Sequence, residues 1–574
     1  MTPSLVDAES VLAIDFGSVQ TRALLFDVVE GQYTFIAAGL APCTMGAPYF
    51  DALESFHVAM QHLTRITGRT FLDDESRLIL PGAEDGSGVD RLVLTFSAGE
   101  ELKVVVTGLL GEVSLESVQR AASSAYARIV DTFSLSDHRR TDVQLDALLK
   151  LHPDIILMAG GTDGGATRSV YKMADLIFMA CRLLPREERP EIIFSGNQSV
   201  AAKIKEGLSK WTTVHLAPNI RPTIDQEDLS PAMSTLAGVV AGIRSHKVRG
   251  LEGLNSIASA PTLPTAAAFG RMVRFLGQLY DTSKGVMAVD VGASWTMLAA
   301  TGKDTYALNV LPLGSGAGAA GVLTQSSLAE ITRWLPVHIQ PEEARDRIYQ
   351  KSLHPAALPE SLEDLWIEQA VARQAMRLAV TGTRERWPSL GLSFEPILVS
   401  GSVITRAPRP QQSLLMVLDG LQPFGISTIV LDQNGLTPAL GAIAAFNSIL
   451  PVQVFESGAY LPLATVICPA SSAREGTPIL QARLVYPGGE EDVFEVTKGS
   501  LLALPLKPGD TGKLYLQPLR GTELDPRVRR TGGFKITGGL CGAVIDARGR
   551  PLQLPAEDAR RRELQKKWSL ALGG

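Results

Sequence analysis

The sequence predicts an α/β protein of two related lobes, with an inserted α/β subdomain in the first lobe and a β-rich C-terminal region. Three observations predict it. One hairpin pattern occurs twice, and strand–turn–helix patterns follow each copy. After about residue 450 the sequence pattern changes to short β-like runs. A chain of 574 residues is long enough for three to four domains at about 150 residues per domain.

The repeated hairpin lies at residues 11–26 and again at residues 286–300. Each copy is an apolar run, an Asp-x-Gly turn and a second apolar run, with the turns at Asp15 and Asp290. Glycine permits a tight turn, so each copy is expected to be a hairpin of two buried strands.

Further matches follow the hairpins in the same order along the chain. Residues 154–168 parallel residues 396–406, and residues 213–242 parallel residues 428–445; each is a strand, a polar turn and a helix rich in small residues. Three matches in register predict two copies of one α/β unit. A long amphipathic helix is expected from about residue 360 to residue 386.

The expected domain boundaries follow from these patterns. The first lobe is predicted over residues 1–285, with an inserted subdomain at about 81–150 that carries β-like runs and a helix with an N-cap serine. The second lobe is predicted over residues 286–450. The β-rich region takes residues 451–574 and ends in a charged amphipathic helix over residues 557–572.

Composition excludes several classes of function. With 54 Lys and Arg against 60 Asp and Glu the net charge is −6, which argues against a general binder of nucleic acid or anionic membranes. The four cysteines form no CxxC and the eight histidines show no close ligand spacing, so neither a disulfide scaffold nor a zinc site is expected. The N-terminus has no signal-peptide pattern, and the longest apolar stretches are too short to cross a bilayer, so a cytoplasmic protein is expected.

The two hairpins together provide what a phosphate clamp needs. Backbone N–H groups in a glycine turn can face phosphate oxygens closely, and Ser18, Thr21 and Thr296 add hydroxyl donors. Asp15 and Asp290 are the candidate catalytic and metal-holding residues, because their carboxylates could bind Mg²⁺ through its retained waters. A single Asp-x-Gly is a common turn; the duplication in register favours the functional interpretation.

Other glycine-rich segments leave alternatives open. Gly401 and Ser402 follow a buried strand, where an α/β site could accept a nucleoside. Asp163, in the Gly-Gly-Thr-Asp-Gly-Gly loop, could touch a ligand or partner, or cap the following helix. The loop at residues 314–318 could contact phosphate or be a flexible connection. Trp295 is expected to pack between the lobes rather than stack on a base.

Four segments of the chain resemble motifs of one protein superfamily. Residues 15–22 resemble the first phosphate motif of the actin, sugar-kinase and DnaK-type chaperone superfamily, and residues 290–296 resemble the second. Residues 397–408 resemble the adenosine motif, and residues 260–270 resemble the connecting helix. The resemblance implies a duplicated actin-like (ribonuclease H-like) two-lobe ATPase fold that binds ATP and Mg²⁺. The nucleotide-binding residues it implies are Gly17, Ser18, Thr21, Arg22, Gly292, Thr296, Gly401 and Ser402.

Within that superfamily the chain most resembles the glutamate mutase L family. The residues that carry this resemblance are the Gly-Gly-Thr-Asp-Gly-Gly loop at 160–165, the run at 96–109 and the Pro-Thr-Leu-Pro-Thr-Ala segment at 261–266. The resemblance implies an ATP-binding, chaperone-like accessory protein whose client protein is a cobalamin-dependent mutase.

Three residues depart from the superfamily's patterns. Thr296 is followed by Met297 where an aspartate is common, Ala260 stands where a glutamate often orients water, and Arg22 stands where lysine is frequent. We therefore expect nucleotide binding with weak or no hydrolysis. The alternatives are a non-catalytic actin-like scaffold or assembly protein and, with less support, a small-molecule kinase, for which no acidic base is evident.

Overall fold

The computed structural model describes residues 9–280, 284–525 and 533–573. The first lobe is built on a sheet of order β3-β2-β1-β4-β10, in which β1 pairs antiparallel with β2 and parallel with β4. Helix α1 (Ala52–Thr67) packs on β3. The strands of this sheet are β1 (Val11–Phe16), β2 (Gln20–Val29), β3 (Gln32–Pro42), β4 (Arg91–Phe96) and β10 (Leu263–Pro264).

The second lobe repeats this order. Its sheet runs β13-β12-β11-β14-β15, with β11 antiparallel to β12 and parallel to β14. These strands are β11 (Met287–Val291), β12 (Thr296–Thr301), β13 (Tyr306–Leu311), β14 (Ile397–Ser400) and β15 (Gly425–Leu431). The shared order 3-2-1-4-5 confirms the predicted duplication, and makes β4 the counterpart of β14.

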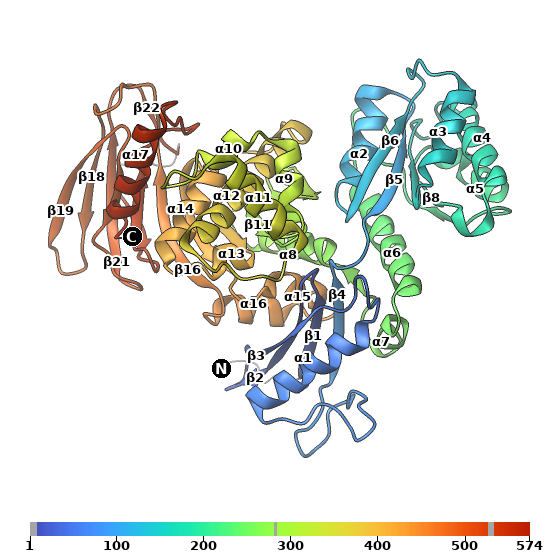
Figure 1. Ribbon diagram of the computed structural model, residues 1–574, viewed down its shortest axis with the longest axis horizontal. Helices are drawn as coiled ribbons and strands as arrows, with labels where there is room; N and C mark the ends of the chain where they lie inside the picture. Colours follow the sequence, from blue (N-terminus) through green and yellow to red (C-terminus); the bar gives the residue numbers. More distant parts are fainter. Residues whose placement is uncertain (1–8, 281–283, 526–532, 574) are drawn as a thin grey trace.

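A third body interrupts the first lobe after β4 and stands apart from the C-terminal strands (Figure 1). It is a wholly parallel sheet of order β6-β5-β7-β8-β9. Its strands are β5 (Leu102–Thr107), β6 (Ala127–Phe133), β7 (Ile155–Met158), β8 (Glu191–Phe194) and β9 (Val214–Leu216). Its helices are η1 (Gly111–Leu115), α2 (Glu116–Ala122), α3 (Thr141–Leu151), α4 (Arg168–Leu183), η2 (Arg186–Glu188) and α5 (Gln198–Leu208).

This body corrects two expectations. The predicted subdomain at about 81–150 includes β4, which belongs to the first lobe, and omits β7 to β9. The predicted matches of residues 154–168 and 213–242 to the second lobe are wrong, because β7 and β9 pair within the inserted sheet. A strand, a glycine turn and a helix follow one another in any parallel α/β unit, so the pattern could not tell the two sheets apart.

Helices join the two lobes. The chain returns from the insert through α6 (Ser230–Lys247) and α7 (Leu251–Ile257) to β10 and α8 (Thr265–Leu279), which packs against α15 (Leu436–Ile443). The helices approach so closely that a Cβ at Gly441 would lie 1.9 Å from the carbonyl oxygen of Ala268. None of the described helices is long and apolar enough to span a membrane.

The remaining helices of the second lobe cover its sheet and reach the first lobe. Helix α12 (Leu362–Arg386), which begins with a Ser361–Asp364 capping box, confirms the predicted long helix. From α16, Gln453 accepts a hydrogen bond of 2.8 Å from the backbone N–H of Tyr33 in β3. The helices other than α12 and α15 are α9 (Ala319–Gln325), α10 (Leu328–Thr332), α11 (Pro341–Leu353), α13 (Ser402–Thr405), α14 (Pro410–Gly420) and α16 (Ile449–Glu456).

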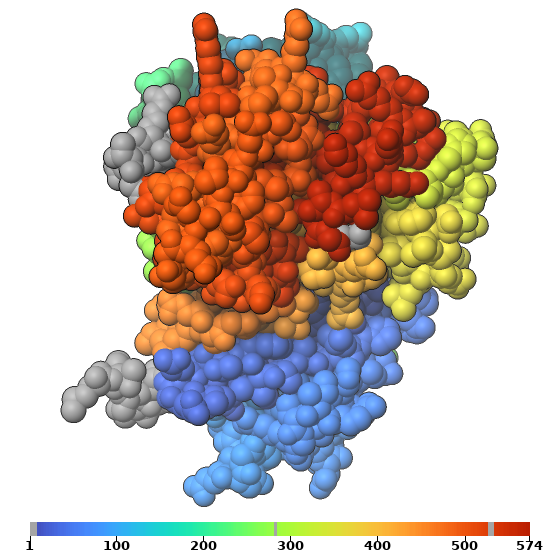
Figure 2. Space-filling model, turned by 90° about the vertical axis from the view of Figure 1, so that its left-hand side faces the viewer, coloured from blue at the N-terminus to red at the C-terminus, as the bar shows by residue number. Residues whose placement is uncertain are grey.

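The C-terminal region continues the second lobe's sheet. β16 pairs with β15, and β24 and β20 follow, making an eight-stranded sheet, so the expected boundary at residue 451 does not separate two sheets. A four-stranded sheet, β19-β18-β21-β23, packs on these strands, and Figure 2 shows this region and α17 at the near face. The elements are β16 (Leu461–Cys468), β17 (Ala470–Ser471), β18 (Pro478–Val485), β19 (Glu491–Thr497), β20 (Leu501–Leu504), β21 (Thr511–Pro518), β22 (Thr522–Glu523), β23 (Phe534–Thr537), β24 (Ala543–Asp546) and α17 (Asp558–Ala571).

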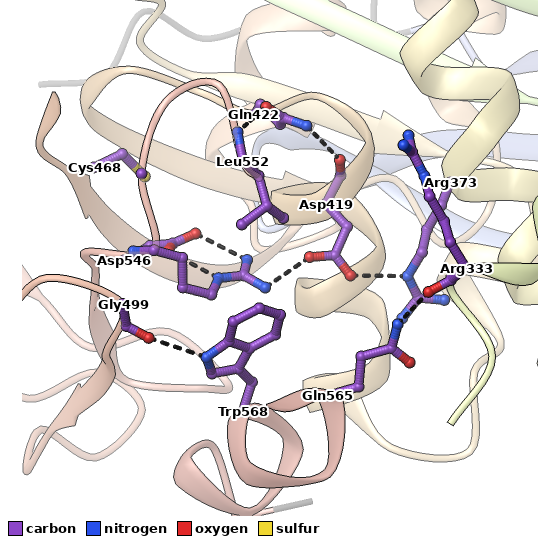
Figure 3. Close-up of polar contacts among 12 residues, drawn as sticks. Arg333, Arg373, Asp419, Gln422, Cys468, Gly499, Asp546, Leu552, Gln565 and Trp568 are labelled. Atoms are coloured by element: carbon purple, nitrogen blue, oxygen red, sulfur yellow. Dashed lines mark hydrogen bonds and ion pairs between the residues drawn. The ribbon is translucent and has the colours of Figure 1, made fainter. Parts of the chain in front are cut away.

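A buried ionic network fastens this region to the second lobe (Figure 3). Arg548 donates two hydrogen bonds of 2.9 Å to the carboxylate of Asp546 and one of 2.8 Å to Asp419 of α14. Arg373 of α12 donates to the other oxygen of Asp419 at 2.9 Å. The Trp568 ring of α17 lies 4.8 Å from the Arg548 guanidinium, so Arg548 joins α14, α17 and the end of β24, and α12 joins the network through Asp419.

Candidate functional site

The two hairpin turns have the same geometry. The N–H of Gly17 donates to the carbonyl of Gln20 at 3.0 Å, and the N–H of Gly292 donates to the carbonyl of Trp295 at 2.9 Å. A Cβ would lie 2.8 Å from that carbonyl oxygen at Gly17 and 2.9 Å from it at Gly292, closer than a side chain tolerates. Both turns therefore require glycine for the same close approach.

The strand register makes the two aspartates sister residues. Asp15 lies opposite Arg22 in the first hairpin, and Asp290 lies opposite Met297 in the second. Both carboxylates line one cavity of about 350 Å³ between the lobes. Of the residues predicted for the site, that cavity is lined by Asp15, Gly17, Ser18, Arg22, Asp290, Gly292, Gly401 and Ser402.

Thr21 and Thr296, also predicted as hydroxyl donors, do not line the cavity. Both are fully buried, and the Thr296 hydroxyl donates to the carbonyl of Leu313 at 2.8 Å. Side chains alternate along a strand, so the residue beside Arg22 or Met297 faces away from the cavity. Neither threonine lines the cavity, and only the hydroxyl of Thr296 has a hydrogen-bond partner among the described residues.

Hydroxyl groups and an arginine hold Asp15 in place. Its Oδ1 accepts hydrogen bonds from Thr95 at 2.8 Å and Thr265 at 2.7 Å, and Arg22 Nη1 lies 4.0 Å from its Oδ2. Arg22 also reaches the other lobe, since a Cβ at Gly435 would lie 2.1 Å from Nη1. One guanidinium thus lies beside the carboxylate of the first lobe and the start of α15 in the second.

Asp290 has a less favourable environment for its charge. Burial, with smaller contributions from Asp432 and Asp15, raises the pKa of Asp290 to about 6, while Arg22 and Ser400 oppose the shift. Two carboxylates from two lobes therefore share a cavity, and burial disfavours the charged form of one of them, Asp290. That is the electrostatic condition under which a cation is attracted between them.

Glycines also shape the backbone around the rest of the cavity. Gly401 has φ +103°, and a Cβ there would lie 2.2 Å from the carbonyl oxygen of Val291, so β14 can end beside β11 only with glycine. In the 314–318 loop, the N–H groups of Gly316 and Gly318 both donate to the carbonyl of Ala293 at 2.9 Å. That loop supports the second hairpin turn, and Ser315 lines the cavity.

Several cavity residues were not predicted from the sequence. Lys351 and Glu368 form an ion pair of 2.7 Å at one wall, and the Lys351 ammonium also donates to the carbonyl of Ala357 at 2.5 Å. The segment 355–359 and Arg406 complete that wall. No local motif marks these residues, because they come from α11, α12, the segment between these helices and the end of α13.

Two residues with open interpretations have structural roles outside this cavity. Asp163 accepts hydrogen bonds from the N–H of Gln198 at 3.0 Å and the amide of Asn219 at 2.9 Å, so it joins its loop to α5 rather than capping α4. Trp295 packs edge-on against Tyr126 of the insert, with ring centroids 5.5 Å apart. Trp295 also packs against an apolar cluster to which both lobes contribute, as predicted.

No dedicated metal cage is present in the part of the chain that the structure describes: no group of three or more His, Cys, Asp or Glu side chains is placed to hold a metal ion. All four cysteines are free. Any cation at Asp15 and Asp290 would therefore complete its coordination with water and ligand oxygens, as Mg²⁺ commonly does.

Two lobes of one strand order, with sister Asp-x-Gly hairpins facing one interlobe cavity, define a protein of the actin-like ATPase fold. The chain belongs to the MutL protein family, whose model matches residues 11–458. This match confirms the resemblance to the glutamate mutase L family.

Individual relatives are more distant. Protein MutL of Clostridium tetanomorphum is 25% identical over 292 residues, which is 50% of this chain and 57% of that protein, so the match spans little more than half of the relative. Among solved structures, nucleotide-free acetone carboxylase matches with 12% identity over 86% of this chain and 82% of that chain, with a TM-score of 0.32. The nucleotide-free diol dehydratase-reactivating factor matches with 10% identity over 76% and 99%, with a TM-score of 0.30.

Proposed function

We propose that the chain binds ATP with Mg²⁺ in the interlobe cavity and acts as a chaperone-like accessory protein with weak or no ATP hydrolysis. The observation that carries the proposal is the pair of sister hairpins that face one cavity from two lobes. Glycine turns present backbone N–H groups to phosphate oxygens, and Arg22 adds a fixed fork of donors.

The donor set fits Mg²⁺. Asp15 and Asp290 offer oxygen ligands from the two lobes, and a cation beside Asp290 would favour the charged form of this carboxyl, whose pKa burial raises to about 6. When bound, Mg²⁺ would neutralise phosphate charge. Gly401 and Ser402, at the end of β14, would take the nucleoside side of the ligand.

The proposal of weak hydrolysis rests on two positions that carry no carboxylate, Met297 and Ala260. Met297 occupies the position opposite Asp290, and its sulfur accepts a hydrogen bond of 2.9 Å from Tyr126. Ala260 supplies no carboxylate. Orienting an attacking water needs an aligned acceptor, and neither of these two positions provides one.

Isothermal titration with Mg²⁺ and a non-hydrolysable ATP analogue tests the binding proposal. We expect Asp15→Asn with Asp290→Asn to weaken binding at least about tenfold, the loss of roughly one charge-assisted contact. The matched control is Asp74→Asn with Asp304→Asn, which removes two exposed carboxylates outside the cavity. Equal affinity in the site variant and the wild type would refute the proposal.

Because the chain belongs to the MutL protein family, we propose that its client protein is a cobalamin-dependent mutase. Its affinity for this client would change when the lobes close around the nucleotide. Surface plasmon resonance with such a mutase from the same organism should show a dissociation rate that differs between Mg-ATP and Mg-ADP. Equal dissociation rates with the two nucleotides, in a protein that still binds ATP, would contradict the proposed client but not the proposed ATP site.

A further inference from the structure

A second cavity lies where the insert and both lobes meet. It measures about 340 Å³ and is bordered by α6, α8 and β13, with Ser124 and Ala125 of the insert at one side. It shares no lining residue with the interlobe cavity described above. Its size falls within the range of cavities that hold small organic ligands.

Two arginines on one face of α8 give this cavity its charge. Arg274 Nη1 donates to the Ser230 hydroxyl at 3.0 Å, and its guanidinium lies 4.9 Å from the centre of the Tyr306 ring. Arg271 Nη1 donates to the carbonyl of Gly441 at 3.5 Å. Among the described residues neither arginine forms an ion pair, and no aspartate or glutamate lines the cavity.

The position of these cations is built into the fold. A Cβ at Gly270 would lie 2.1 Å from the Tyr306 hydroxyl oxygen, so glycine at this position lets the end of the Tyr306 side chain approach α8, where Arg274 lies over its ring. Burial lowers the pKa of Arg271, and among the residues that the structure describes Tyr306 opposes that shift. A partly buried guanidinium without an anion is unfavourable, and a ligand that supplies one relieves it.

Besides the arginines, the cavity is lined by apolar side chains together with three serines and a glutamine. Met233, Leu263, Phe275 and Leu308 form its walls, with Gln278 at the end of the same face of α8. From this pairing of two guanidinium groups that have no carboxylate partner among the described residues with an apolar wall, we propose that the cavity binds a small organic anion: a carboxylate or phosphate on a short apolar body. The arginines hold the anionic group, and the apolar side chains cover the body.

The test uses the full chain with phenyl phosphate and benzoate as probes and benzamide as the neutral analogue, observed by saturation-transfer NMR and titration calorimetry without nucleotide. We expect both anions to bind and Arg271→Gln with Arg274→Gln to weaken them at least about tenfold, the loss of charge-assisted hydrogen bonds. The matched control, Arg182→Gln with Arg186→Gln, removes two exposed arginines of the insert and should bind like the wild type.

A second variant keeps both arginines and fills the cavity with a larger side chain. Ser234 lies exposed on α6 at the edge of the cavity, so Ser234→Trp should block both probes without loss of the folded state. The proposal is overturned if neither anion binds, if benzamide binds as well as benzoate, or if the glutamine variant keeps full affinity. Binding of phenyl phosphate alone would assign the site to phosphate compounds, and binding of benzoate alone to carboxylates.

Discussion

At the scale of single residues, Asp15 and Asp290 occupy the same position of one motif but lie in different electrostatic environments. Asp15 accepts hydrogen bonds from Thr95 and Thr265. Asp290 faces Met297 across its hairpin, and burial raises its pKa. The two carboxylates differ because of their surroundings and not because of their sequence motif. Such differences are common at functional sites that place charge in a buried position.

The raised pKa of Asp290 makes a prediction about stability. Its pKa rises from 3.8 to about 6 in the folded chain, so the folded state binds a proton more tightly than the unfolded state, and stability falls as pH rises through this window. Above it, Asp290→Asn should increase the free energy of unfolding by about 2 kcal/mol. Urea unfolding at pH 7.5 measures the gain; Asp304→Asn should show none, and destabilisation by Asp290→Asn at that pH would contradict the assignment.

Gly401 carries a second prediction at this scale. With φ +103° and a Cβ 2.2 Å from the carbonyl oxygen of Val291, Gly401→Ala has to move β14 away from β11. We expect a loss of about 2 kcal/mol or more in unfolding free energy. Gly391→Ala is the control, since its Cβ meets nothing within 4 Å. Thermal unfolding of the two variants decides the matter, and equal melting temperatures would show that the strand end is free to shift.

Residue identity alone predicted part of the candidate site. The aspartates and glycines of the hairpins could be found because their turns recur, and strand alternation would have removed Thr21 and Thr296 from the list. Thr265 and Glu368 could not be found this way. They reach the cavity from helices far along the chain, and only the packed fold brings those helices to the turns.

At the scale of elements, local patterns predicted hairpins and the long helix α12 but not which sheet each strand joins. β7 has the apolar run and glycine turn expected of β14's counterpart, yet it pairs with β5 and β8. The true counterpart, β4, lies next to β1 and is followed by the insert rather than a helix. Strand pairing depends on residues far apart in the sequence, so the insertion after β4 kept the local pattern from identifying β4 as the counterpart of β14.

The network around Arg548 gives a prediction for the C-terminal elements. Asp546 and Arg548 are buried, and the two adjacent arginines, Arg548 and Arg550, hold the pKa of Asp546 well below its usual range. Arg548→Met would leave the carboxylates of Asp546 and Asp419 without their shared partner. We expect a loss of about 3–5 kcal/mol, the usual consequence of breaking a buried ion pair from one side.

Chemical denaturation measures that loss. The exposed Arg560 of α17 supplies the comparison, because Arg560→Met should change stability by less than about 0.5 kcal/mol. Adding Trp568→Ala completes a double-mutant cycle: the two changes should be non-additive, since Trp568 rests on the Arg548 guanidinium. Strict additivity would mean that α17 docks independently of the network.

At the scale of the whole molecule, the lobes meet through the close contact of α8 with α15, and both cavities border α8. The interlobe cavity is lined by turns from both lobes, so a ligand there would bridge them. The C-terminal four-stranded sheet lies on the second lobe and takes no part in that lining.

This arrangement predicts where nucleotide should slow hydrogen exchange. With Mg²⁺ and a non-hydrolysable ATP analogue, backbone amides at residues 16–21, 291–296 and 354–359 should exchange more slowly, because a bridging ligand suppresses local opening of the segments it contacts. Strands β18 and β21 should be unchanged and serve as the internal reference. The slowing should vanish in the Asp15→Asn, Asp290→Asn variant. Slowing on the first hairpin alone would mean that the ligand binds one lobe without closing the other over it.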